Sequence, residues 1–82
     1  MVLNAEPLER RRLSDLLAQR LMELIQGGSY AAGECLPSIL EIARRSRVSR
    51  ATVREALTRL EVLQLVEVRQ GAGVFVRRPA TG

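Results

Sequence analysis

Residues 38–60 constrain the fold most, because they form two short apolar-periodic segments separated by a tight basic turn. Ser38 is followed three residues later by Glu41. This is the spacing of a capping box, in which each side chain satisfies a backbone N–H at a helix start. Ser49 is a favourable N-cap for the second segment. The apolar residues at helical spacing are Ile39, Ile42 and Ala43, then Val53, Ala56, Leu57 and Leu60. The stretch therefore predicts two helices joined by a short turn.

The positive charge of the chain is concentrated in the same stretch. Between Arg44 and Arg59 lie six arginines and one acidic residue, a net charge of +5, whereas the remaining residues carry −1. A sequence pI near 11.0 favours a polyanionic partner, although a basic soluble surface alone would also raise it. Two helices around a short turn, with basic and small polar residues opening the second, are typical of a helix-turn-helix that reads DNA.

The segments on either side complete a small domain. Leucines at helical spacing predict an amphipathic first helix, which two glycines end. Residues 28–37 then form a connector, and we expect Tyr30 and Leu36 to pack under it. Beyond the third helix, two β-rich segments flank a turn that contains glycine, which indicates a hairpin. The predicted elements are helices over 13–26, 38–46 and 49–63, and strands over 65–68 and 74–76.

These elements predict a mainly α fold with a small β-hairpin, which is a winged helix-turn-helix of three helices plus a C-terminal wing. At 82 residues the chain holds one such domain. We expect residues 1–12 to form an N-terminal arm or tail, and residues 13–77 the winged helix DNA-binding domain. Residues 78–82 are expected to form the start of a linker.

Composition argues against several other functions. The chain has no histidine and a single cysteine, Cys35, so the usual general base and the commonest metal ligand are absent. We therefore expect no cofactor, no metal site and no enzyme activity. An aromatic content of 2% argues against single-strand binding by base stacking. No apolar run reaches the length of a membrane span, so we expect no membrane partner and a cytoplasmic location.

Several motifs follow one another over residues 13–77. They are Gly28-x-Tyr30-x-x-Gly33-x-x-Leu36-Pro37-Ser38, Glu41-Ile42-Ala43, Val48-Ser49-Arg50-x-Thr52-Val53-Arg54-Glu55-Ala56-Leu57 and Gly71-x-Gly73-x-Phe75-Val76. In this order they closely resemble the DNA-binding domain of the GntR family of bacterial transcription regulators. The resemblance implies sequence-specific binding of double-stranded DNA, with repression as the family's commonest mode.

The resemblance also implies roles for individual residues of the third helix. The residues that match Ser49 and Arg50 contact phosphate and base near the helix start, and the residue that matches Thr52 contacts phosphate. The arginine that matches Arg54 reads guanine, in keeping with the bidentate fit of guanidinium to guanine O6 and N7. The glutamate that matches Glu55 is expected to orient neighbouring arginines.

The remaining candidates lie in the turn and the wing. Arg45 and Arg47 are expected to contact phosphate, and Ser38 lies at a helix N-terminus, where phosphate also binds. Arg69 flanks the wing tip, and the resemblance places Gly71 at this tip, close to the minor groove. The predicted DNA-binding residues are Ser38, Arg45, Arg47, Ser49, Arg50, Ala51, Thr52, Arg54, Arg69 and Gly71.

The chain departs from the family pattern at several positions. The family usually has arginine where this chain has Leu40, which can only contact a thymine methyl or face a partner. Glycine is usual at the positions of Arg47 and Gln64, so the third helix is expected to continue further or to end with strain. Ala72 replaces a common basic residue of the wing.

One such domain reads only a few base pairs, so we expect a homodimer on a palindromic operator. GntR regulators normally join this domain to a larger C-terminal domain. The resemblance therefore implies that residues 78–82 begin a linker to a missing C-terminal domain, which is the other expected route to the dimer. The alternative hypothesis is a winged helix that serves as a protein–protein docking module. Its docking face would consist of Leu40 and the wing.

Overall fold

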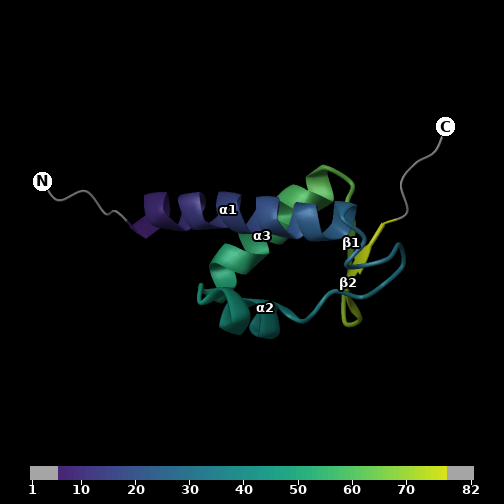
Figure 1. Ribbon diagram of the computed structural model, residues 1–82. Helices are drawn as coiled ribbons and strands as arrows, with labels where there is room; N and C mark the ends of the chain where they lie inside the picture. Colours follow the sequence, from purple (N-terminus) through teal and green to yellow (C-terminus); the bar gives the residue numbers. More distant parts are fainter. Residues whose placement is uncertain (1–5, 78–82) are drawn as a thin grey trace, which may run out of the picture.

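The computed structural model describes residues 6–77 and contains the three predicted helices and the predicted hairpin (Figure 1). The elements are α1 (Glu6–Gln26), α2 (Ile39–Ser46), α3 (Arg50–Val62), β1 (Val66–Arg69) and β2 (Gly73–Val76). The order and type of the elements confirm the winged helix-turn-helix. Within the described residues, no helix combines the length and the apolar character that a bilayer crossing requires.

Helix α1 begins at Glu6, so the predicted start at residue 13 is wrong and residues 6–12 are helical. These residues have no apolar period, but ion pairs support them. Arg12 lies 2.8 Å from Glu9 at a spacing of three residues, and this hydrogen bond lowers the pKa of Glu9 below its ordinary value. Arg10 reaches across to α3. Residues 1–5 of the predicted arm, and the predicted linker over 78–82, lie outside the described residues.

The N-terminus of α2 is capped by Ser38, as predicted. Its hydroxyl accepts a hydrogen bond from the backbone N–H of Glu41 at 3.1 Å. The Glu41 carboxylate does not complete the predicted capping box by accepting from the backbone N–H of Ser38. Its Oε2 lies 2.9 Å from Nε of Arg45 instead. That pair has the favourable spacing of four residues along the exposed face of the helix.

The turn between α2 and α3 contains a left-handed residue, Arg47, with φ of 57°. The next N–H, of Val48, donates to the carbonyl of Ala43 at 3.1 Å, which closes the end of α2 in the manner of a Schellman motif. Ser49 then caps α3 by accepting from the N–H of Thr52 at 3.1 Å. The turn thus ends one helix and begins the next within a few residues.

Helix α3 ends at Val62 rather than continuing, and Gln64 adopts the left-handed conformation that favours glycine, with φ of 63°. The N–H of Leu65 donates to the carbonyl of Leu60 at 2.9 Å, and the N–H of Gln64 donates to Glu61 at the same distance. This is again a Schellman ending. Of the two predicted outcomes, the strained ending is the one observed.

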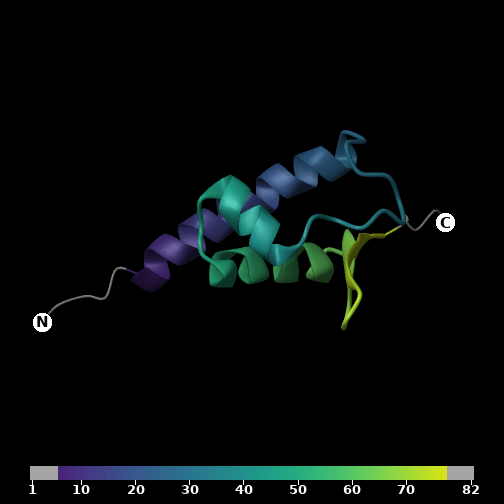
Figure 2. The same cartoon turned by 90° about the horizontal axis from the view of Figure 1, so that it is seen from below.

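The two strands pair in antiparallel register, each within one residue of its predicted bounds. The connector adds to the outer edge of β2 through a bridge between Cys35 and Phe75, and the N–H of Leu36 donates to Val74 at 2.8 Å. Gly71 occupies the turn with φ of 77°. The hairpin stands beyond the C-terminal end of α3, and its turn projects away from α1 (Figure 2).

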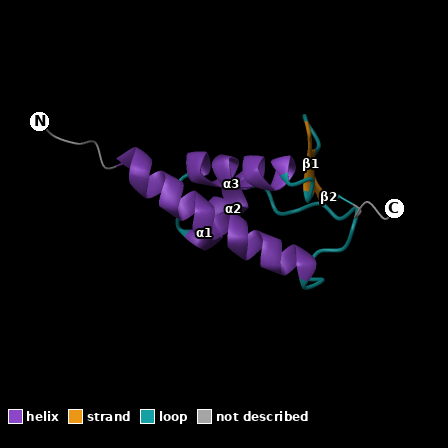
Figure 3. Ribbon diagram, turned by 90° about the horizontal axis from the view of Figure 1, so that it is seen from above, coloured by secondary structure: helices purple, strands orange, loops and turns teal. Residues whose placement is uncertain are grey.

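The core gathers around α3, which α1 crosses obliquely (Figure 3). Val53, Ala56 and Leu60 of α3 are completely buried. The core also takes residues from the other helices, the connector and the hairpin: Leu17, Leu21, Leu36, Ile42, Val66, Val74 and Val76. Leu36 is buried and Tyr30 packs against this cluster, so the expected packing of the connector is confirmed.

Candidate nucleic-acid interface

A concave groove of about 590 Å³ opens between α2, α3 and the wing. Helix α2 contributes its N-terminal end, α3 its exposed face, and the hairpin its turn. The predicted DNA-binding residues that line it are Ser38, Arg50, Arg54, Arg69 and Gly71. Five candidates that lie on four different segments of the chain are thus brought to one surface.

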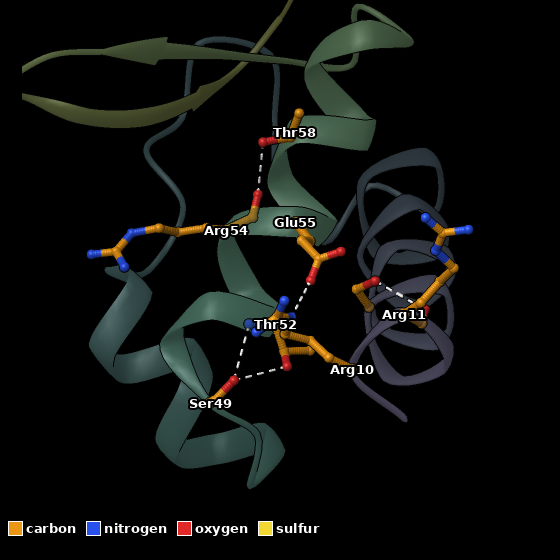
Figure 4. Close-up of polar contacts among 8 residues, drawn as sticks. Arg10, Arg11, Ser49, Thr52, Arg54, Glu55 and Thr58 are labelled. Atoms are coloured by element: carbon orange, nitrogen blue, oxygen red, sulfur yellow. Dashed lines mark hydrogen bonds and ion pairs between the residues drawn. The ribbon is translucent and has the colours of Figure 1, made fainter. Parts of the chain in front are cut away.

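Arg50 and Arg54 form the basic wall of the groove. Both side chains are exposed, and they lie one helical turn apart on α3. Among the described residues, neither guanidinium has an ion pair or a side-chain hydrogen bond. In Figure 4 the side chain of Arg54 extends from α3 on the side away from α1. The donors of this guanidinium are therefore free to meet a ligand in the groove.

Glu55 does not orient these two arginines, so that expectation is wrong. Its Oε2 lies 2.7 Å from Nε of Arg10 on α1, on the opposite side of α3 (Figure 4). This oxygen is shielded from solvent and accepts no hydrogen bond within the described part of the chain, so the contact is an ion pair only. Glu55 therefore holds α1 against α3 instead of shaping the groove. The expected N-terminal arm or tail over residues 1–12 gave Arg10 no such role.

Ser49 and Thr52 have a structural role at the start of α3. Ser49 is exposed, whereas Thr52 retains only 2% of its surface. Their hydroxyl oxygens lie 2.9 Å apart, and Ser49 also caps the helix (Figure 4). The predicted phosphate contact of Thr52 gains no support from this burial, whereas Ser49 remains accessible at the helix N-terminus.

Arg69 is held along the wing rather than extended from its tip. Its guanidinium carbon lies 4.4 Å from the centre of the Phe75 ring, within the range of a cation–π contact. Nε of Arg69 also lies 3.2 Å from a carboxylate oxygen of Glu67. Both contacts fix the charge beside the groove. The glycine at the tip, Gly71, has open space around the position of a side chain.

The other candidates lie outside the groove. Arg45 pairs with Glu41 and lines a separate groove between α1 and α2. Arg47 is exposed in the turn before α3, and Ala51 is half-buried in the first turn of α3. The structure therefore does not bring Arg45 to the surface that holds Arg50 and Arg54.

Val68 lines the groove but was not among the predicted DNA-binding residues. It lies on β1 and is 44% exposed, although Val66 on the same strand is completely buried. Alternation along a strand places residues two apart on one face, yet these two valines differ in burial. Sequence periodicity alone does not show where along a strand the core ends, so it could not identify Val68 as a residue of the groove.

The three helices, the helix-turn-helix and the hairpin define the chain as a winged helix-turn-helix, with an exposed basic face on its third helix. Residues 13–76 match the family described as bacterial regulatory proteins, gntR family. The match covers most of the chain, and the chain belongs to this family.

Relatives and solved structures agree with this assignment. The chain is 48% identical over 68 residues to the Exu regulon transcriptional regulator of Escherichia coli (strain K12), covering 83% of this chain and 26% of that protein. It is 37% identical over 78 residues to the HTH-type transcriptional repressor NanR of Enterobacter sp. (strain 638), covering 95% and 30%. The structure of AraR(DBD) in complex with operator ORX1 superposes with a TM-score of 0.76 at 26% identity, over 78% and 77% of the two chains. The chain thus spans less than a third of the length of these two curated relatives.

Proposed function

We propose that this chain binds double-stranded DNA in a sequence-specific manner and acts in transcription regulation. The observation that carries the proposal is the exposed pair Arg50 and Arg54, which is free of internal carboxylates among the described residues and faces a groove beside the wing. In this arrangement α3 enters the major groove, whose width of about 12 Å admits a helix. The wing lies near the minor groove. The operator complex of AraR(DBD), which has the same fold, supports this docking.

The proposed contacts divide by type. Arg50 and Arg54 read guanine edges, because a guanidinium donates two parallel hydrogen bonds to O6 and N7. Arg47, Ser38 and Ser49 contact phosphates, which position the protein without carrying sequence information. Ala51 lies between the two arginines in sequence, and we propose that it packs against the groove. Arg69 and Gly71 approach the minor groove.

We further propose repression as the mode of regulation and a homodimer on a two-fold symmetric operator. The relative named a transcriptional repressor supports the first point. The second follows from the few base pairs that one recognition helix reads, since two half-sites give the specificity that one lacks. We also propose that the chain has no catalytic role. We propose a cytoplasmic location, because the DNA lies there.

Selection of bound sequences from a random duplex pool tests the proposal. We expect enrichment of one guanine-containing half-site, and a pair of such half-sites related by two-fold symmetry when two copies bind. Titration of a fluorescent duplex of arbitrary sequence should show weak binding that falls steeply with added salt. If no sequence is enriched and no salt-sensitive binding appears at low salt, DNA binding is refuted, and this outcome favours the alternative of a protein–protein docking module.

A further inference from the structure

Leu40 is an exposed leucine in the same groove as the arginines. It lies in the first turn of α2 and keeps 48% of its surface, whereas Ile42 and Ala43 on the other face of that helix are buried in the core. Val68 of β1 also lines this groove and is 44% exposed. The groove therefore combines an apolar wall with a basic wall.

The charge of the groove decides what covers this apolar wall. Arg50 and Arg54 line the groove without internal partners among the described residues, and Arg69 lines it from the wing. The residues of 6–77 that line the groove include no aspartate or glutamate. A polyanion is therefore the complementary occupant. On the major-groove edge of duplex DNA, the C5-methyl of thymine is the apolar group that a leucine can contact.

We propose that Leu40 determines specificity by packing against a thymine methyl in the half-site whose guanines meet Arg50 and Arg54. This proposal rests on the proposed DNA-binding function and adds a base that the arginines do not read. Leucine has no hydrogen-bond donor or acceptor, so it selects by burial of the methyl and by leaving the polar edges of other bases unsatisfied.

Replacing thymine by deoxyuridine tests the proposal, because this change removes only the methyl. The probe is the duplex enriched from the random pool, with each thymine of the half-site replaced in turn. For the unchanged protein we expect one position at which the dissociation constant rises about four-fold, the ratio that corresponds to burial of one methyl group. The Leu40→Ala variant should bind the two duplexes equally at that position.

Leu8→Ala is the matched control, since Leu8 is 66% exposed on α1 and lies outside the groove. It should keep the full sensitivity to deoxyuridine. A second variant, Leu40→Arg, should shift the preferred base at the same position from thymine to guanine in a repeated selection. Binding that is insensitive to every deoxyuridine replacement overturns the proposal, as does an equal sensitivity in Leu40→Ala. An enriched half-site would in either case leave the proposed function standing, and Leu40 would then face a protein partner.

Discussion

The two sides of α3 carry the same residue type, arginine, in opposite electrostatic circumstances. On the side that packs on α1, Arg59 pairs with Asp15, and Glu55 pairs with Arg10. On the side that faces the wing, Arg54 has no ion pair among the described residues. Charges that hold helices together are already neutralised by their partners. Arg50 and Arg54, which line the groove, keep a charge that no carboxylate among the described residues neutralises.

This difference changes the meaning of the charge cluster at residues 44–59. Counted along the sequence, the cluster carries a net charge of +5. In the folded chain Arg45 and Arg59 are each paired with a carboxylate outside the cluster. The density of arginine in a sequence therefore identifies a basic region, whereas the packing of the helices decides which of those arginines face a ligand.

The largest expected effect is a loss of stability, caused by a substitution among the buried apolar residues between the two sides of α3. Leu60 is completely buried, so Leu60→Ala should lower the free energy of unfolding by about 2–5 kcal/mol through lost burial and an unfilled cavity. Denaturant titration followed by circular dichroism measures this change. Leu63→Ala, where the leucine is 59% exposed, should change stability by less than about 0.5 kcal/mol. Equal losses in both variants would contradict the placement of the core.

The next effect separates the two sides directly. Arg54→Ala should weaken binding to the selected duplex by about 1–3 kcal/mol and leave binding to arbitrary duplex nearly unchanged, because a base contact is lost. Arg59→Ala removes the same side chain from the α1 side of the same helix and should leave both affinities unchanged. Fluorescence anisotropy at fixed salt measures them. A loss of equal size on both kinds of DNA would refute base reading by Arg54.

The parts of the fold that sequence periodicity predicted are those in which burial alone decides the structure. Helix α2, helix α3 and the hairpin fall within one or two residues of their predicted bounds. The start of α1 was missed because residues 6–12 lack an apolar period and are supported by ion pairs, one of them to Glu55. Such pairing depends on which elements pack together. For the same reason, sequence proximity could not tell that Arg45 lies outside the groove.

A smaller effect on stability is expected from a substitution just after the end of α3, which changes no residue on either side of the helix. Gln64 has a positive φ that glycine adopts without a steric penalty. Gln64→Gly should therefore raise the free energy of unfolding by about 0.5–1 kcal/mol, since the relieved strain exceeds the added entropy of the unfolded chain. Thermal unfolding measures the change, and DNA affinity should stay constant.

The same substitution within a helix provides the control for Gln64. Gln19 is exposed on α1, and Gln19→Gly should lower stability by about 1 kcal/mol because glycine is unfavourable in a helix interior. If the change in stability has opposite signs at the two positions, the gain at Gln64 is due to backbone conformation. Destabilisation at both would contradict the left-handed ending of α3.

The smallest effect on DNA binding is expected at Arg45, an arginine of the basic cluster that is paired with a carboxylate. Arg45 pairs with Glu41 and lies outside the groove, so Arg45→Gln should leave the salt dependence of DNA binding unchanged. Arg47 is exposed beside the start of α3, and Arg47→Gln should lower the slope of log K against log salt by about 0.9, the value of one phosphate contact. Titrations over a range of salt measure both slopes. The sequence alone predicted a phosphate contact for each arginine, and an equal reduction in the two variants would restore that interpretation. A reduction in Arg47→Gln alone would mean that an exposed arginine of this cluster becomes a DNA contact when no carboxylate of the described residues pairs with it.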